Sequence, residues 1–462
     1  MSDKSLVKAY TRKDKAFWGL AQLGTSLFAG VYGAALVIFF HVYLELDPFY
    51  IGVSAWIYAI WNALNDPIFG YLSDRTASKQ GRRIPYMRYT APFLALFFIL
   101  LWLVPIGSDQ VSIFLWMIIF MLLYDTGYTI IGLVYSALLP ELTEDDKVRG
   151  EFQTSSSLFY LLGTILGFLL PDLVRPEVGS TELLPFYITM IIIAIVGMIA
   201  IITTTFKFKE RPEFTKVDTP VSLGKALKYT FRSKAFLVLT SANFMSIFFQ
   251  QMLLSYMFYV ATFVLQTSSI LLLAFLFLGL IVGVLSANKL AKRFGYVRAN
   301  QTLLFLGSIA LILLPFLPDV AIYPCLFIAG IGLAGPLVLT NVLYAQVADE
   351  DETKTGVRRE AAFFGTNAML TKPAQSIAIG TGPALLAIAG FVTGQVTQGP
   401  TALFMIKVLI GLLPGIVMLV GVFILFLYPL KGEHLEKIQK QVLEMHKEKH
   451  SKLLDMEGKS DN

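Results

Sequence analysis

Long apolar segments alternate with short polar ones along most of the chain. A helix that crosses about 30 Å of hydrocarbon needs about 20 largely apolar residues, and twelve segments meet this requirement. They cover residues 18–43, 49–72, 87–107, 111–139, 153–174, 184–206, 236–265, 268–288, 299–317, 320–347, 360–390 and 400–429. The pattern predicts an all-α membrane protein with twelve transmembrane helices.

The composition agrees with a lipid environment. Of the 462 residues, 56% are apolar and 15% are charged, whereas soluble domains average about 45–50% and about 25%. A net charge of +5 can indicate a nucleic-acid partner. Here the location of the basic residues explains that charge, so no nucleic-acid partner is expected.

The basic residues also predict the orientation. Of the 37 lysine and arginine residues, 34 lie in the two tails and in every second loop, while the alternate loops contain only Arg175. Basic residues are retained on the cytoplasmic side during insertion. We therefore expect an integral protein of the plasma (inner) membrane with both termini in the cytoplasm.

The longest polar segment between predicted spans is 207–234. It is interpreted as a cytoplasmic linker between two six-helix halves, 1–206 and 235–430. The tail 431–462 repeats apolar residues every three or four positions, which is typical of an amphipathic helix. These residues are Leu435, Ile438, Val442 and Met445. Its many charges predict a surface element rather than a site.

Two weak internal repeats support this division. The loop segment 72–83, after the second span, is echoed by 285–295 after the eighth. Segment 144–149, after the fourth span, is echoed by 349–359 after the tenth. A displacement of six helices in the same orientation is expected of parallel halves related by an axis along the membrane normal.

Four motifs carry a family resemblance. Residues 65–85 read NDPIFGYLSDRTASKQGRRIP, 135–143 read YSALLPELT, 348–360 read ADEDETKTGVRRE and 371–375 read TKPAQ. The chain thereby resembles the major facilitator superfamily and, within it, the glycoside–pentoside–hexuronide cation symporters. The resemblance implies two pseudo-symmetric six-helix halves and cation-coupled sugar transport by alternating access.

Several polar residues within predicted spans are candidates for cation binding and coupling. Asp66 shares one helix face with Asn62 and Asn65, and Asp125 stands four residues before Thr129 on another helix. A membrane carboxylate is costly and usually marks an ion or substrate path. Such oxygens suit a small hard cation, and a carboxylate alone can carry a proton. The alternative is that these groups only join helices by hydrogen bonds.

The resemblance also bears on whether the coupling ion is a proton or sodium. It implies a possible sodium site at Asn62, Asp66 and Thr129, but the family has acids where this chain has Asn62 and Gly132. The site loses two formal negative charges unless Asp125 reaches it. The departure favours a proton over sodium as the coupling ion.

The substrate site departs further from the family pattern. Ungapped matching places these residues at sugar-binding positions: Thr25, Ser26, Gly132, Ser136, Ser157 and Lys372. Only Lys372 keeps the family's residue type. Hydroxyl groups can still bind a polyol, but they lack the charge-assisted grip of carboxylate and arginine. A galactoside in particular is not supported.

The loop after the second predicted span carries a candidate gate. Asp74, Arg75, Arg82 and Arg83 resemble the cytoplasmic loop motif of the superfamily. Asp74 is expected to pair with an arginine of the loop or to lie at a helix N-terminus, where a negative charge is favoured. A contact made in only one conformation would bias alternating access. Ordinary retention of basic loops explains the arginines but not the aspartate.

These observations predict a secondary transporter that couples a sugar or glycoside to a cation. One alternative keeps the fold and exchanges the sugar for an amphipathic lipid such as a lysophospholipid; a second is a non-transporting receptor, which the membrane charges disfavour. His41, His434, His446 and His450 show no metal-ligand spacing, and no nucleophile with a base is visible. We therefore expect no enzymatic activity and no cofactor. The expected partners are a small-molecule substrate, a coupling cation and membrane lipid.

Overall fold

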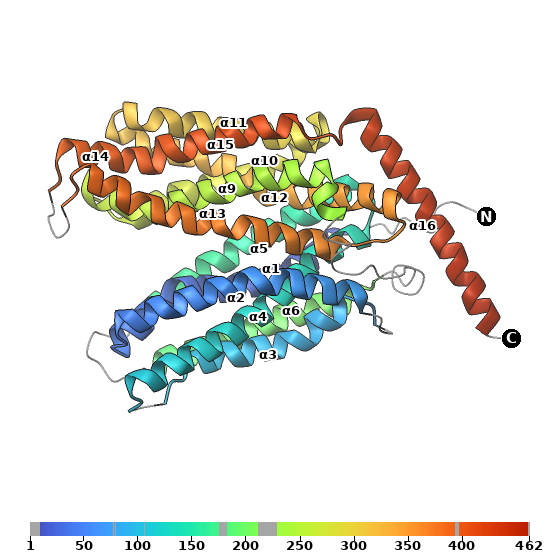
Figure 1. Cartoon of the computed structure of the whole chain (residues 1–462), viewed down its shortest axis with the longest axis horizontal. Coiled ribbons are helices and arrows are strands. Elements are labelled where there is room, and N and C mark those ends of the chain that lie inside the picture. Colours follow the sequence, from blue (N-terminus) through green and yellow to red (C-terminus); the bar gives the residue numbers. More distant parts are fainter. Residues whose placement is uncertain are drawn as a thin grey trace. The chain divides into compact units, whose positions relative to one another are not determined.

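The computed structural model describes residues 10–460 apart from 77, 79, 106, 175–182, 211–228 and 393–396. Within these residues the secondary structure is helical, with no strand (Figure 1). Most of the predicted linker therefore lies outside the described residues, as does Arg175.

The helices match the predicted segments in order and number. The first six are α1 (Arg12–Ile38), α2 (Pro48–Arg75), α3 (Ile84–Trp102), α4 (Gln110–Leu142), α5 (Asp146–Leu173) and α6 (Leu184–Lys207). The next five are α9 (Lys234–Tyr259), α10 (Ser269–Phe294), α11 (Tyr296–Leu313), α12 (Ile322–Thr355) and α13 (Glu360–Ile388). The last predicted span consists of α14 (Pro400–Lys407) and α15 (Leu413–Phe426), joined by a π-helical turn, and α16 (Gly432–Ser460) follows it.

Nine helices in the described part of the chain are long and apolar enough to cross a membrane. The other three predicted spans coincide with α1, α2 and α13. Two of these, α2 and α13, contain candidate-site residues such as Asp66 and Lys372, which lower the mean hydropathy of the helix. The helices in the described part of the chain therefore agree with the twelve-span arrangement that the sequence predicts.

Several helices extend beyond the predicted boundaries, and α5 and α12 extend furthest. α5 begins at Asp146 instead of residue 153, and α12 continues to Thr355 instead of residue 347. Hydropathy marks only the part of a helix that lies in lipid, while backbone hydrogen bonding continues into polar sequence. The side chain of Arg149 helps at the first boundary, because it donates to the Thr143 carbonyl at the end of α4 (2.8 Å).

The chain separates into two compact units. The first unit contains Met1–Leu227 with Asp351–Met369 and Gln439–Asn462, and the second contains Lys228–Glu350 and Leu370–Ile438. The first unit contains the predicted half 1–206, and the second contains most of the predicted half 235–430. The end of α12, the start of α13 and most of α16 join the first unit instead of following the chain order, and buried ion pairs described below account for this.

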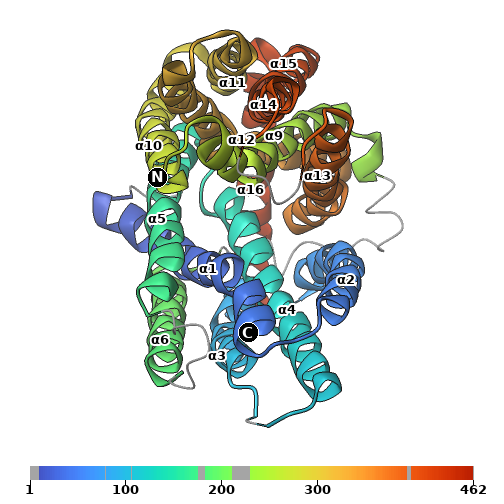
Figure 2. The ribbon, with the colours of Figure 1, turned by 90° about the vertical axis from the view of Figure 1, so that its left-hand side faces the viewer.

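Within the first unit, α1 lies beside α5 and α6, and α4 lies beside α2 and α3 (Figure 2). Glycines allow the closest of these approaches: a Cβ atom built on Gly167 of α5 would lie 2.8 Å from the Leu27 carbonyl oxygen and 2.9 Å from the Gly30 Cα of α1. An aromatic stack fixes α1 to α4, because the rings of Trp18 and Tyr135 lie 4.3 Å apart. The two helices that carry the candidate cation residues, α2 and α4, also pack directly against each other.

In the second unit, α15 packs against α9 and α11, and α10 packs against α11. Glycines again allow close contact. A Cβ atom on Gly279 would lie 1.8 Å from the Phe327 carbonyl oxygen, so α10 and α12 approach each other through bare backbone.

Candidate functional site

A buried polar cluster joins α2 to α4 in the first unit. Asp125 is 3% exposed and accepts hydrogen bonds from the Tyr58 hydroxyl (3.0 Å) and from the Asn65 side-chain amide (2.6 Å). The same Asn65 amide nitrogen lies 3.3 Å from Thr129 Oγ1. Three of the five candidate cation residues, Asn65, Asp125 and Thr129, thus form one hydrogen-bonded group, and Asp125 does reach the face of α2.

The buried amide oxygen of Asn65 is a candidate ligand for a bound cation or water molecule. Asn65 is 1% exposed, and its Oδ1 atom has no hydrogen-bond partner within the described part of the chain. A buried acceptor without a partner costs free energy, and a bound cation or water molecule would relieve that cost. Asp66, the next residue of α2, is 6% exposed and places a second carboxylate near this position along the helix.

The surroundings of Asp66 are tightly packed. A Cβ atom on Gly365, in the first turns of α13, would lie 2.7 Å from the Asp66 carbonyl oxygen. Gly365 therefore allows α13 to approach the backbone of α2 at the candidate carboxylate. Asn62, one turn earlier on α2, is half-buried.

A group of tyrosines, which the sequence analysis missed, surrounds Asp125. The rings of Tyr32 and Tyr124 stack at 5.0 Å, Tyr124 and Tyr128 stack at 6.0 Å, and Tyr32 lies 6.2 Å from Tyr58. The rings come from α1, α2 and α4. Tyr124 and Tyr128 flank Asp125 in the sequence, but their convergence with Tyr32 depends on the packing of three helices.

Two of the candidate substrate hydroxyls are used within α1. Thr25 donates to the carbonyl groups of Ala21 and Gln22 (3.2 and 3.1 Å), and Ser26 donates to Leu23 (3.1 Å). A Cβ atom on Gly163 of α5 would lie 2.0 Å from Ser26 Oγ. Both side chains are buried, and Ser26 lies in the contact between α1 and α5.

The remaining substrate candidates lie on three helices. Gly132 of α4 faces open space, since among the described residues no atom lies within 4 Å of a Cβ built on it. Ser136 is half-buried on α4, and Ser157 is 1% exposed on α5. Lys372 is half-buried on α13 and belongs to the second unit.

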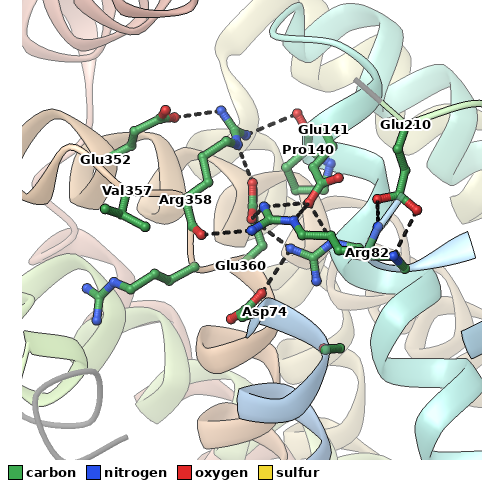
Figure 3. Close-up of polar contacts among 12 residues, drawn as sticks. Asp74, Arg82, Pro140, Glu141, Glu210, Glu352, Val357, Arg358 and Glu360 are labelled. Atoms are coloured by element: carbon green, nitrogen blue, oxygen red, sulfur yellow. Dashed lines mark hydrogen bonds and ion pairs between the residues drawn. The ribbon is translucent and has the colours of Figure 1, made fainter. Parts of the chain in front are cut away.

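A second polar site, the loop cluster, is built on the loop between α2 and α3 (Figure 3). Arg82 pairs with Glu141 (2.7 Å) and Glu360 (3.2 Å). Arg83 pairs with Glu141 (2.5 Å), Glu360 (2.8 Å) and Asp74 (3.1 Å). Both arginine side chains are at most 3% exposed. Burial disfavours the charged form of Arg82, but the carboxylates of Glu141, Glu360 and Asp74 outweigh it and raise its pKa.

The four candidate gating residues are therefore not equivalent. Of the two partners considered for Asp74, the structure contains the arginine of the same loop, Arg83. Arg75 is exposed and donates to the hydroxyl of Tyr71 on its own helix. Arg82, Arg83 and Asp74 belong to the loop cluster, and Arg75 lies at its edge.

Glu210, just after α6, holds the loop from the other side. Its carboxylate accepts hydrogen bonds from the three backbone N–H groups of residues 82–84, at 2.6–2.8 Å. These groups begin α3, where a negative charge is favoured. Burial and the nearby charge of Glu141 nevertheless raise the pKa of Glu210. Gly81, with φ +106°, leaves room for the carboxylate, since its Cβ would lie 2.5 Å away.

The loop cluster continues into the segment after α12. Arg358 pairs with Glu360, pairs with Glu352 (2.7 Å) and donates to the Pro140 carbonyl (3.1 Å), while its own carbonyl accepts from Arg82 (3.3 Å). These contacts join segments far apart in the sequence. They explain why residues 351–369 belong to the first unit.

The tail differs from the expected surface element. α16 buries Val442, His446 and Lys449, which lie on one face of the helix. His446 and Lys449 contact the carboxylate of Glu352, at 2.9 and 2.8 Å. His446 and Lys449 are buried because they contact the carboxylate of Glu352. The spacing of residues in the tail does not indicate these contacts.

Comparison with known proteins agrees with this architecture. The family model for "MFS/sugar transport protein" matches residues 17–432. The sodium-dependent lysophosphatidylcholine symporter 1-B of Danio rerio is 23% identical, with 87% of this chain and 84% of the relative covered. The putative glycoside/cation symporter YagG of Escherichia coli (strain K12) is 24% identical over 94% of this chain and 95% of its own.

Solved structures show the same fold. The Escherichia coli fucose:proton symporter FucP superposes with a TM-score of 0.68 at 11% identity, covering 90% of this chain and 99% of FucP. A bacterial homologue of the iron transporter ferroportin gives a TM-score of 0.66 at 12% identity, with the same coverage. Since the family model spans nearly all of the helices, this integral membrane protein belongs to the MFS/sugar transport protein family of the major facilitator superfamily, as the sequence motifs predicted.

Proposed function

We propose that the protein is a secondary active symporter that moves a small-molecule substrate together with a cation by alternating access. The polar cluster between α2 and α4 supports this most directly. It combines the buried carboxylate of Asp125 with the Asn65 amide oxygen, which has no hydrogen-bond partner in the described part of the chain. Burying such groups within membrane helices is costly and is typical of an ion path.

The proposed coupling ion is a proton, with Asp66 as its carrier and Asp125 as a second acid. The uncharged Asn62 and Gly132 leave a metal-cation site short of negative charge. Sodium is the second candidate, because the Asn65 oxygen offers a ligand and a lysophosphatidylcholine symporter among the relatives is named as sodium-dependent.

The proposed substrate is a sugar or glycoside, with Gly132, Ser136 and Ser157 of the first unit and Lys372 of the second as the candidate binding residues. The similarity to a putative glycoside/cation symporter supports it. A lysophospholipid is the second candidate. It is favoured by similarity to the lysophosphatidylcholine symporters and by the hydroxyls of Thr25 and Ser26, which donate to their own helix.

The proposed gate is the loop cluster. Arg82, Arg83 and Asp74 hold the loop after α2 against Glu141 and Glu360. We infer that this contact forms in only one state of the transport cycle. From the distribution of lysine and arginine, we place the loop cluster and both termini on the cytoplasmic side.

Uptake by purified protein in liposomes tests these proposals. Either a pH gradient or a sodium gradient is imposed, and radiolabelled glycosides and lysophosphatidylcholine are offered in parallel. Glycoside uptake driven by the pH gradient alone is the expected result. Uptake driven only by sodium would reject proton coupling, and uptake of the lipid alone would reject the sugar. The absence of gradient-driven uptake of either class would contradict the proposal of symport of these substrates.

A further inference from the structure

The imidazole of His446 lies at the centre of the contact between α16 and the rest of the first unit. It is 2% exposed. Its Nδ1 atom lies 2.6 Å from Glu144, in the connection between α4 and α5. Its Nε2 atom lies 2.9 Å from Glu352 of α12 and 2.8 Å from Arg358, in the connection between α12 and α13.

The two neighbours of Nε2 require different protonation states. Nε2 can accept a hydrogen bond from the Arg358 guanidinium only when it carries no hydrogen. It can donate to the Glu352 carboxylate only when it carries one. Nδ1–H can donate to Glu144 in either case. Protonation of this one ring therefore decides whether the imidazole donates to one carboxylate or to two.

Both ring nitrogens of His446 lie within hydrogen-bond distance of a carboxylate, Glu144 at Nδ1 and Glu352 at Nε2. The protonated ring can therefore donate to both carboxylates together. Hydrogen bonds between charged partners are shorter and about twice as strong as neutral ones.

Other contacts on the same face hold α16 without titrating near neutral pH. Val442 is 1% exposed, and the Gln439 side chain donates to Asp146 at 2.8 Å. Loss of the imidazolium should therefore weaken docking without unfolding the unit.

We propose that α16 is a pH-responsive strap, which docks firmly on the first unit when His446 is protonated and loosens when it is neutral. Histidine is the side chain that ordinarily changes charge between pH 5 and 8. The strap contacts Glu352 and Arg358, and Arg358 pairs with Glu360 of the loop cluster. Its consequence for transport rests on the proposed gate, but docking itself does not.

Spin-label distance measurements test the strap directly. The only cysteine, Cys325, is replaced by alanine, and labels are attached at Lys147→Cys and Lys452→Cys, two exposed positions of the first unit. The full chain in nanodiscs is measured at pH 6 and pH 8. We expect the docking equilibrium constant to be about ten-fold larger at pH 6, the effect of one charge-assisted hydrogen bond.

Two variants locate the effect. His446→Gln should give the same distance distribution at both pH values, whereas His434→Gln, an exposed histidine of the same helix, should keep the response. A wild-type distribution that does not change between pH 6 and 8 overturns the proposal, whether or not a variant folds. A response that survives in His446→Gln overturns the assignment to this ring.

The distance measurement also separates this inference from the proposed function. A protein that shows the pH-dependent distance change but transports nothing would reject symport and keep the strap. A protein that transports normally but shows the same distance at both pH values would reject the strap and keep symport.

Discussion

Single polar side chains inside the membrane helices carry the proposed coupling. Asp66 and Asp125 lie on neighbouring helices, and Asn65 connects the second of them to Thr129. A buried carboxylate changes its charge state with large consequences for its neighbours. Substitutions that remove a charge or a hydrogen bond while preserving shape are therefore the most informative at this scale.

Asp66→Asn should abolish uphill accumulation while the protein still inserts and folds. Asparagine keeps the size of the side chain and removes the titratable charge. One ion moving down 100 mV supplies about 2.3 kcal/mol, or about fifty-fold accumulation, and the variant should reach only the equilibrium distribution. Glu433→Gln, at the exposed start of α16, is the control. Wild-type accumulation by Asp66→Asn would remove this residue from coupling.

Tyr58→Phe should move the pH of half-maximal transport upward by about one unit. The ring remains, but the hydroxyl that donates to Asp125 is lost, so the ionised acid loses part of its stabilisation. Initial uptake rates across a pH series measure the shift. Tyr71→Phe removes a hydroxyl that contacts exposed Arg75 instead and should leave the profile unchanged. An equal shift in both variants would contradict a specific role for Tyr58.

At the scale of whole elements, helices are positioned by contacts at their ends and by glycines along their faces. Glu210 caps α3, and glycines bring α1 and α5 together. Hydropathy predicts that a helix is present, whereas the helix cap and the close contacts at glycines depend on backbone geometry. Each can be tested against a position that lacks the constraint.

The cap of α3 should be sensitive to pH. Because the pKa of Glu210 is raised in the folded protein, its contribution to stability is fully present below its ordinary value of 4.5 and is lost as the pH rises through the raised value. The stability difference between wild type and Glu210→Gln should therefore be largest in acid and shrink toward neutral pH. Thermal unfolding in detergent across pH 4–8 measures it, and a difference that grows with pH would be inconsistent with the assignment.

Gly167→Ala should destabilise the first unit by about 1–3 kcal/mol through overpacking. The new methyl group would press against Leu27 and Gly30 of α1. The matched variant Gly132→Ala meets no atom within 4 Å among the described residues and should stay within about 0.5 kcal/mol of wild type. Unfolding midpoints of the two variants provide the comparison, and equal values would show that α1 and α5 can separate freely.

At the scale of the whole molecule, buried charge decides which segments belong together. Residues 351–369 and the tail beyond 439 follow the second half in sequence but pack with the first unit. The loop cluster, with Arg82 and Arg83 at its centre, supplies the reason. A buried ion pair contributes little net stability, but breaking one by removing a partner is expensive.

Arg83→Gln should lower the stability of the first unit by about 3–5 kcal/mol, because it leaves buried carboxylates without compensation. Arg75→Gln, which removes an exposed arginine at the end of α2, should cost less than about 1 kcal/mol. Unfolding curves measure both, and accessibility of the loop cluster to labelling reagents reports the proposed gate. If the two variants behave alike, the buried ion pairs of the loop cluster do not stabilise the first unit.

The long apolar segments and, for the tail, the periodic apolar residues were sufficient to predict the helices. Each crossing needs a long apolar run, so the twelve spans, the six-plus-six order and the position of α16 could be derived without coordinates. The motifs were sufficient for the family, and residue spacing predicts that Asn62, Asn65 and Asp66 share one helix face. Local pattern suffices for such features because neighbours on one helix are fixed by its own geometry.

Packing between helices decided the rest. The convergence of Tyr32 and Tyr58 on Asp125, the burial of Ser26 between α1 and α5, and the contact of His446 with Glu352 join residues distant in sequence. Charged residues of loops and tails look solvent-exposed in any local pattern. Only the three-dimensional arrangement of opposite charges makes their burial favourable, so the loop cluster and the docked tail required the tertiary structure.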